Sequence, residues 1–226
     1  MARMLRRCQL LAFLVVSAPA IYPLAAAQSF PLDSAKGLEP IGVSIQPVTY
    51  QGRKAVRLTE LAASQGGGVA VLSAASFHDG VLEVELAGKP AQGASGDARG
   101  FVGIAFRTAP DASRYECVYL RPTNGRADDQ LRRNHSTQYI SIPEYEWFRL
   151  RSETPGKYES YVDLVPGEWT KLRIEVSGVK LRLYVNGSPQ PVLLVNDLKH
   201  GDSTGAIALW IGPGTEAYFS NLRLTP

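Results

Sequence analysis

Apolar and polar residues alternate with a period of two along most of the chain after its first 27 residues. This period is typical of strands that bury one face, and Gly, Pro, Asn, Asp and Ser separate the alternating runs. No long segment has the 3.6-residue period of an amphipathic helix. The pattern predicts one all-β domain whose strands lie at 55–60, 77–88, 100–107, 115–121, 168–176, 179–187, 191–197, 205–212 and 216–224.

The register of one predicted hairpin follows from its side chains. A two-residue turn at Ser177–Gly178 places Glu175 opposite Lys180 and Arg173 opposite Arg182. The buried face then holds three apolar pairs, Val176–Val179, Ile174–Leu181 and Leu172–Leu183. We therefore predict this register, in which one like-charge pair is tolerated.

Three strands carry small residues on the face that points away from the core, interrupted by Arg, Tyr and Trp. Gly and Ala leave room above a sheet, whereas Arg, Tyr and Trp supply hydrogen-bond donors and flat apolar rings, which suit a sugar. We predict a concave binding face that includes Arg107, Tyr119, Arg121 and Trp210. The alternative is a second packed layer that covers the small residues.

Residues 120–139 and 144–161 are unusually polar for their length, and binding residues often lie on loops held by a rigid scaffold. Asp128 and Glu159 are candidates for acid–base chemistry, and His135 is a candidate proton shuttle because its neighbours are polar. Further candidates for substrate binding in these segments are Asn124, Gln130, Arg132, Asn134, Gln138, Tyr139, Trp147 and Tyr158.

Residues 1–27 have a basic start, an apolar run and a small-residue exit, which predicts a secretory signal peptide cleaved after Ala27. An uncleaved anchor is the alternative. Cleavage predicts a secreted or periplasmic protein with no stable membrane anchor. Cleavage removes three Arg and no acidic residue, so residues 28–226 carry 21 basic and 21 acidic side chains. This balance argues against nucleic acid as a partner.

The mature chain contains one cysteine, Cys117, because Cys8 leaves with the signal peptide. An internal disulfide and a cysteine-based metal site are therefore excluded. The three histidines lack ligand spacing, so we expect no metal and no cofactor; a structural calcium at Asp128 or Asp129 is the alternative. His-Glu-x-x-His and phosphate-loop motifs are absent from the sequence. We expect a monomer.

Three segments, 100–107, 167–187 and 205–224, resemble the concanavalin A-like jelly-roll domains of the secreted 3-keto-glycoside (3-keto-disaccharide) hydrolase family, which is related to glycoside hydrolase family sixteen and laminin G modules. The resemblance covers about residues 76–224. It implies a two-sheet antiparallel jelly-roll sandwich with a carbohydrate site on the concave sheet. The family carries Gln and His in the penultimate strand, where this chain has Trp210 and Gly212.

Together these features predict a single jelly-roll domain, residues 28–226, that binds carbohydrate in a groove on its concave sheet. One alternative is a glycoside hydrolase or lyase that uses the same groove. A second alternative is a laminin G-like module that binds protein. Two carboxyl groups facing each other across the groove favour the enzyme. A flat apolar patch in place of the groove favours the protein-binding module.

Overall fold

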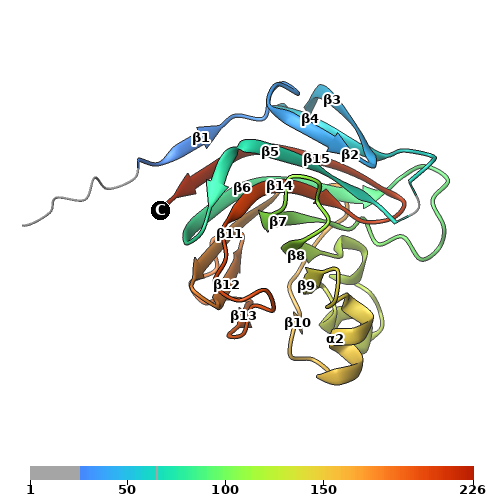
Figure 1. Cartoon of the computed structure of the whole chain (residues 1–226). Coiled ribbons are helices and arrows are strands. Elements are labelled where there is room, and N and C mark those ends of the chain that lie inside the picture. Colours follow the sequence, from blue (N-terminus) through green and yellow to red (C-terminus); the bar gives the residue numbers. More distant parts are fainter. Residues whose placement is uncertain (1–25, 65) are drawn as a thin grey trace, which may run out of the picture.

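The computed structural model describes residues 26–64 and 66–226, which form two antiparallel β-sheets packed face to face (Figure 1). All of the predicted signal peptide except its last two residues lies outside this described part. No helix in the described ranges is long and apolar enough to cross a membrane. The first sheet, sheet A, contains in spatial order β13 (Leu193–Val195), β12 (Lys180–Val185), β11 (Thr170–Ser177), β6 (Gly80–Pro90), β15 (Thr215–Thr225), β4 (Arg53–Glu60) and β3 (Val43–Tyr50), with β1 (Gln28–Phe30) paired to β15.

The second sheet, sheet B, carries the strands whose outer faces were predicted to bind. In spatial order it contains β10 (Glu159–Ser160), β9 (Thr137–Ile142), β8 (Tyr115–Leu120), β7 (Val102–Thr108), β14 (Gly205–Ile211), β5 (Gly68–Phe77) and β2 (Leu38–Ile41). The strands on which the predicted small-residue faces lie are therefore direct neighbours: β8, β7 and β14 are hydrogen-bonded in this order.

The core between the sheets consists of the residues that the period of two assigns to the inner faces. Those of sheet B include Ile104, Phe106, Val118 and Leu209, and all are fully buried. They pack against the inner face of sheet A, where Ile174 is fully buried. Two apolar faces brought together in this way exclude water from a single contiguous core. The prediction of a two-sheet antiparallel sandwich is confirmed.

The predicted register of the β11–β12 hairpin is wrong. The turn lies at Gly178–Val179, so that Glu175 faces Arg182 and Arg173 faces Tyr184. Sliding the pairing by two residues leaves the same side chains on the buried face, so the apolar pattern is equally satisfied by both registers. The observed register replaces a like-charge pair by opposite charges, and the left-handed turn position falls on Gly178, with φ 55°.

Three short helices lie where the sequence predicted polar loops. They are η1 (Pro122–Asn124), α1 (Gln130–Asn134) and α2 (Trp147–Glu153). The Asp129 side chain caps α1 by accepting a hydrogen bond from the backbone N–H of Arg132 at 2.7 Å. The predicted strand 77–88 is in fact two strands, since β5 ends at Phe77 and β6 begins at Gly80. The sequence also missed β1, β2, β3, β9, β10 and all of β5 except Phe77.

Candidate functional site

A pocket of about 1120 Å³ lies against the face of sheet B that points away from the core. Segments distant in sequence surround it: the β6–β7 loop, η1, α1, α2 and the β14–β15 loop. Its floor is largely apolar and consists of Phe101, Tyr115, Tyr119, Ile140, Ile142 and Trp210. Its walls carry His135 and several charged side chains, Asp97, Arg99, Arg121, Asp129, Arg132, Glu146 and Arg151.

Two aromatic side chains meet across a glycine at the centre of the floor. Trp210 pairs with Gly103 on one side, and Gly103 pairs with Tyr119 on the other. The two ring centroids are 4.6 Å apart. A Cβ at Gly103 would lie 2.5 Å from the Tyr119 Cβ, so the glycine allows this arrangement. Trp210 also donates a hydrogen bond from Nε1 to the Tyr115 hydroxyl at 3.2 Å, which fixes its ring.

Arg121 stands at the end of β8 and is held by four hydrogen bonds. Its Nη1 donates to the His135 carbonyl at 3.2 Å and to Glu159 Oε1 at 3.1 Å. Its Nη2 donates to the Tyr119 hydroxyl at 2.9 Å and to Gln138 Oε1 at 3.1 Å. Only 5% of Arg121 is exposed. Both Nη atoms are thus fully engaged within the protein, and Arg121 orients its neighbours.

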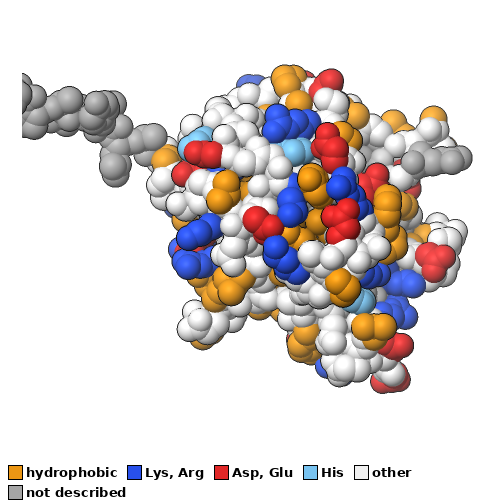
Figure 2. All heavy atoms as spheres, turned by 60° about the horizontal axis from the view of Figure 1, so that its bottom comes forward, with side chains coloured by type: hydrophobic (Ala, Val, Ile, Leu, Met, Phe, Trp, Pro, Cys, Tyr) orange, Lys and Arg blue, Asp and Glu red, His pale blue; other side chains and the backbone are white. Residues whose placement is uncertain are grey.

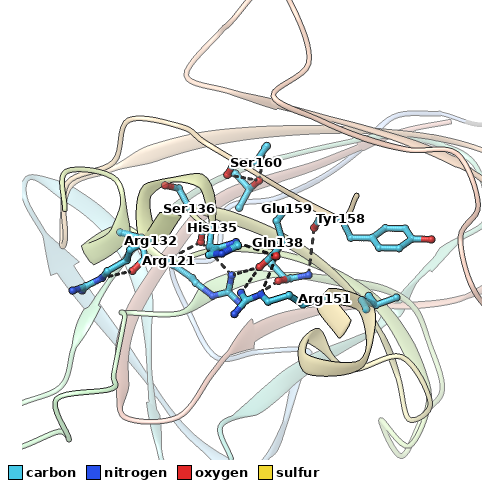
Figure 3. A network of polar contacts seen from close by, with 12 residues as sticks. Arg121, Arg132, His135, Ser136, Gln138, Arg151, Tyr158, Glu159 and Ser160 are labelled. Carbon is cyan, nitrogen blue, oxygen red and sulfur yellow. Dashed lines mark hydrogen bonds and ion pairs between the residues drawn. The ribbon is translucent and has the colours of Figure 1, made fainter. Parts of the chain in front are cut away.

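Glu159, the first residue of β10, is the acid on which three basic side chains converge (Figure 3). Arg151 binds both of its oxygens, with Nε 3.0 Å from Oε2. Burial raises the pKa of Glu159, but the hydrogen bonds and charge of Arg151 and the charges of Arg121 and His135 outweigh burial and hold this pKa below its usual value. Glu159 is therefore ionised at neutral pH.

His135 lies between this carboxylate and the pocket. Its Nδ1 is 3.0 Å from Glu159 Oε2, and the residue lines the pocket. Burial lowers the pKa of His135, and the charges of Arg151 and Arg121 lower it further, against the opposing effect of Glu159; the net pKa is below the usual histidine value. The imidazole is neutral at neutral pH and is suited to accept a proton.

Trp147 and Arg151 form one wall of the pocket from the same face of α2, because they are four residues apart. The guanidinium carbon of Arg151 is 4.8 Å from the centre of the Trp147 ring, and 43% of Trp147 is exposed. Arg151 was not among the sequence candidates, since 144–161 was interpreted as a loop. A helical interpretation would have indicated it, because the spacing of four from Trp147 places both side chains on one face.

The pocket brings together about half of the sequence candidates. Seven of them line it, namely Tyr119, Arg121, Asn124, Arg132, His135, Trp147 and Trp210. Two more, Gln138 and Glu159, lie behind the lining and bind Arg121. The remaining candidates do not line it: Arg107, Asp128, Gln130, Asn134, Tyr139 and Tyr158. Of these, Gln130 and Asn134 are exposed on α1 and bond to each other at 2.7 Å.

Tyr139 and Tyr158 belong to the core between the sheets. Tyr139 alternates with Gln138 along β9, so it points to the opposite face of sheet B. There its hydroxyl donates to the buried Glu116 at 2.5 Å and accepts from the backbone N–H of Lys199 at 2.8 Å. These contacts attach the segment after β13 to sheet B. We assign both tyrosines to the structure of the core.

Arg107 lies apart from the pocket because a β-bulge interrupts the alternation. The register of β14 with β7 shifts beside it, and Arg107 has φ 51°. Its side chain donates to the His78 and Gly178 carbonyls at 2.9 to 3.0 Å and to Asp79 at 3.0 Å. Arg107 thus connects the loop after β5 with the turn between β11 and β12, and we assign it a structural role.

The described residues contain one group with metal-ligating geometry, which is His78, Asp79 and Asp202. The Arg107 guanidinium lies 3.0 Å from Asp79 and 3.6 Å from Asp202, so it already supplies a positive charge to both carboxylates. The alternative calcium ligands are elsewhere: Asp128 is exposed, and Asp129 caps α1. Among the described residues, neither Asp128 nor Asp129 belongs to a cluster of metal-ligating side chains.

Figure 2 shows one face of the molecule, on which basic and acidic side chains are intermixed around small hydrophobic patches. Among the described residues drawn on that face, no extended area of one sign is visible. A nucleic-acid surface usually carries a continuous basic stripe. The face shown therefore lacks the charge pattern of a nucleic-acid surface.

A family model described as a 3-keto-alpha-glucoside-1,2-lyase-like domain matches residues 48–225, and this match confirms the family resemblance noted in the sequence. None of the curated proteins matches the chain.

Several solved structures share the fold. The carbohydrate-binding module CBM66 from Bacillus subtilis is 16% identical, with a TM-score of 0.58 over 83% of this chain and 95% of that one. Lectin II from Ulex europaeus is 10% identical, with a TM-score of 0.55 over 89% and 98%. A putative glycosyl hydrolase from Parabacteroides distasonis is 11% identical, with a TM-score of 0.52 over 87% and 98%. These likenesses confirm the jelly-roll fold.

Proposed function

The chain belongs to the 3-keto-alpha-glucoside-1,2-lyase-like domain family, and from this premise we propose that it binds a carbohydrate in the pocket on sheet B. The observation that carries the proposal is the composition of this pocket: aromatic rings packed against one another form the floor, and side chains with hydrogen-bonding groups form the walls. Sugar rings present an apolar C–H face and a periphery of hydroxyls, which match these two features.

The size of the pocket favours an oligosaccharide. Its volume of about 1120 Å³ lies slightly above the ~300–1,000 Å³ that is typical of small-molecule sites. Trp147 and Leu131 extend the apolar lining at the mouth, and 43% and 69% of these residues are exposed. Such exposed surfaces are available to a second sugar unit beyond the floor.

The proposal includes export and a monomeric state. Export rests on the basic start, apolar run and alanine-rich exit of residues 1–27, and it gives access to glycans outside the cytoplasm. A groove on one sheet of a single domain needs no second copy to be complete. Mass spectrometry of the mature N-terminus and light scattering test these two points.

The test of binding compares two neighbouring aromatic residues. Trp147 lines the pocket, whereas Phe148 is exposed next to it and does not. We expect Trp147→Ala to weaken binding of the best ligand from an oligosaccharide panel about tenfold, because a stacking aromatic contributes ~1–2 kcal/mol. Phe148→Ala should leave the Kd unchanged. Equal losses in both variants, or no binding by the native protein, contradict the proposal.

A second candidate function is cleavage of the bound glycoside, and the His135–Glu159 contact favours it. The neighbouring carboxylate favours the tautomer that carries its proton on Nδ1, which leaves Nε2 as a base. On a 3-keto-glucoside, the base takes the proton at C2, which the C3 ketone acidifies. The electron pair forms the C1=C2 double bond and breaks the C1–O bond, and the departing oxygen is protonated by water. This is a 1,2-elimination.

Turnover separates the two functions. We expect the protein to convert a 3-keto-disaccharide into an unsaturated keto sugar. Ultraviolet absorbance and mass spectrometry detect this product. His135→Gln should abolish turnover and keep the ligand affinity within a few fold, because the amide fills similar space without a basic nitrogen. If the protein binds the ligand but forms no product, its function is binding alone. If His135→Gln retains turnover, another residue is the base.

A further inference from the structure

Two arginines from different segments line the pocket, and Thr123 contacts both of these residues. The backbone carbonyl of Arg99 accepts a hydrogen bond from the Thr123 N–H at 3.3 Å. The Nη2 of Arg132 donates to the Thr123 hydroxyl at 3.2 Å, and its Nε donates to Asn124 Oδ1 at 2.9 Å. Both arginines line the pocket. Figure 3 shows Arg132 on the far side of His135 from Arg151.

These two arginines differ from the other arginines of the pocket in their counter-charges. Arg121 and Arg151 both bind Glu159. Arg132 forms no ion pair with any described residue, and its guanidinium donates only to a hydroxyl and an amide oxygen. The one ion pair of Arg99 is with Asp97, at 3.6 Å, and the Asp97 side chain is 99% exposed. Such a pair is weak in water.

The other two acids of the lining, Asp129 and Glu146, form no ion pair with either arginine among the described residues. Asp129 accepts from the backbone N–H of Arg132 and caps α1, but it forms no ion pair with an arginine of the described chain. Burial lowers the pKa of Arg99, and the charges of Arg132 and Arg121 lower it further, against the smaller opposing effect of Asp97. The positive charges therefore repel one another, and a bound anion would relieve this repulsion.

We propose that the end of the pocket formed by Arg99 and Arg132 is a subsite for an anionic group of the sugar, a carboxylate of a uronic acid or a sulfate ester. A guanidinium offers five N–H donors in a planar fork that fits either anion, and the Nη1 of Arg132 has no hydrogen bond to the described residues. This inference rests on the proposed function, since it names the class of glycan that the pocket takes.

The test uses ligands that differ only in charge. An oligogalacturonate is compared with its carboxyl-reduced form, and a sulfated galactan oligosaccharide with its desulfated form, by isothermal titration calorimetry. In at least one pair we expect the anionic member to bind tenfold or more tightly, because hydrogen bonds to a charged group are stronger than hydrogen bonds between neutral groups. The pair that shows the difference identifies the anion. Raising the salt concentration should reduce the difference.

The variants assign the effect to these residues. We expect Arg132→Gln and Arg99→Gln each to lower the affinity for the anionic ligand about tenfold and the affinity for its neutral form less than twofold. Arg132→Lys should retain part of the preference, and Asp97→Asn should increase it. The matched control is Arg126→Gln: Arg126 is exposed on the same segment, pairs with Asp163 and does not line the pocket.

The outcomes separate the subsite from the proposed function. If the anionic and neutral members of both pairs bind equally, the subsite is disproved and carbohydrate binding stands. If no member of either pair binds, this inference is disproved, and the broader oligosaccharide panel decides the proposed function. An anionic preference that survives in both Gln variants, or that Arg126→Gln abolishes equally, also contradicts the assignment.

Discussion

Arg121 and Glu159 are 38 residues apart in the chain, yet Nη1 of the arginine lies 3.1 Å from Oε1 of the glutamate. Both side chains are almost completely buried, at 6% and 2% exposed. The contact joins the end of β8 to the start of β10, and β9 runs between these strands. The contact therefore stabilises this edge of sheet B, next to which His135 lines the pocket.

Arg121→Lys should destabilise the protein by about 2 kcal/mol, and Arg121→Ala by about 3–5 kcal/mol. Lysine keeps the charge but cannot make the four hydrogen bonds of the guanidinium, and alanine leaves the buried Glu159 without this partner. Chemical denaturation measures both values. A double-mutant cycle with Glu159→Gln should show a coupling energy between the two sites. Full stability of Arg121→Ala would contradict the structural role.

Trp210→Ala should reduce both stability and ligand binding. Only 8% of Trp210 is exposed, and its ring packs on Tyr119, so truncation leaves a cavity that costs about 3–5 kcal/mol. Trp210→Phe retains an aromatic ring but loses the hydrogen bond to the Tyr115 hydroxyl, so it should retain more of both properties. Thermal unfolding and glycan titration of both variants provide the measurement. Native stability of Trp210→Ala would show that the floor is not packed as described.

Cys117 should react with a bulky thiol reagent only after the protein unfolds. The side chain is fully buried on β8 between Ala105 and Ile140 of the neighbouring strands. Burial raises the pKa of this thiol, and the charge of Glu116 raises it further, so little thiolate is present. Labelling of the mature chain in the absence and presence of denaturant should give zero and one thiol per molecule. Rapid native labelling would mean that this face of sheet B opens.

Glu60 should stabilise the loops at the end of the pocket opposite α2 in a pH-dependent way. Its carboxylate accepts hydrogen bonds from the backbone N–H groups of Gly66, Gly67 and Gly214 at 2.7 to 2.9 Å. Burial raises the pKa of Glu60, but these three bonds outweigh burial and hold this pKa below its usual value. The stabilisation is therefore complete above the pKa of the unfolded chain and is lost as the pH falls through the lower folded value.

Hydrogen exchange at these three glycine amides tests the role of Glu60. We expect Glu60→Gln to accelerate their exchange at pH 7 and to weaken ligand binding, because the neutral amide is a poorer acceptor. Thr59→Ser, in the adjacent position of β4, serves as the control and should leave the exchange unchanged. Equal protection in Glu60→Gln and the native protein would show that the loops are held by other contacts.

Local alternation was sufficient to identify which side chains share the outer face of sheet B. The alternation predicts that Tyr119 and Trp210 both lie on this face, because residues two apart point to the same face of a strand. Alternation failed for Arg107, where a bulge adds a residue to one strand. It also left the β11–β12 register undetermined, since a slide of two residues buries the same side chains.

The sequence by itself determined the all-β class, the family resemblance and the small and aromatic character of the binding face, because these depend on residue order and on the period of a strand. The tertiary structure alone decided which polar residues share the pocket. Arg99 and Arg132 line one pocket because Thr123 of η1 bonds to the backbone of Arg99 and to the side chain of Arg132. Arg151 reaches Glu159 from a helix that the sequence pattern did not predict. Such contacts join separate segments of chain, and a local pattern carries no information about them.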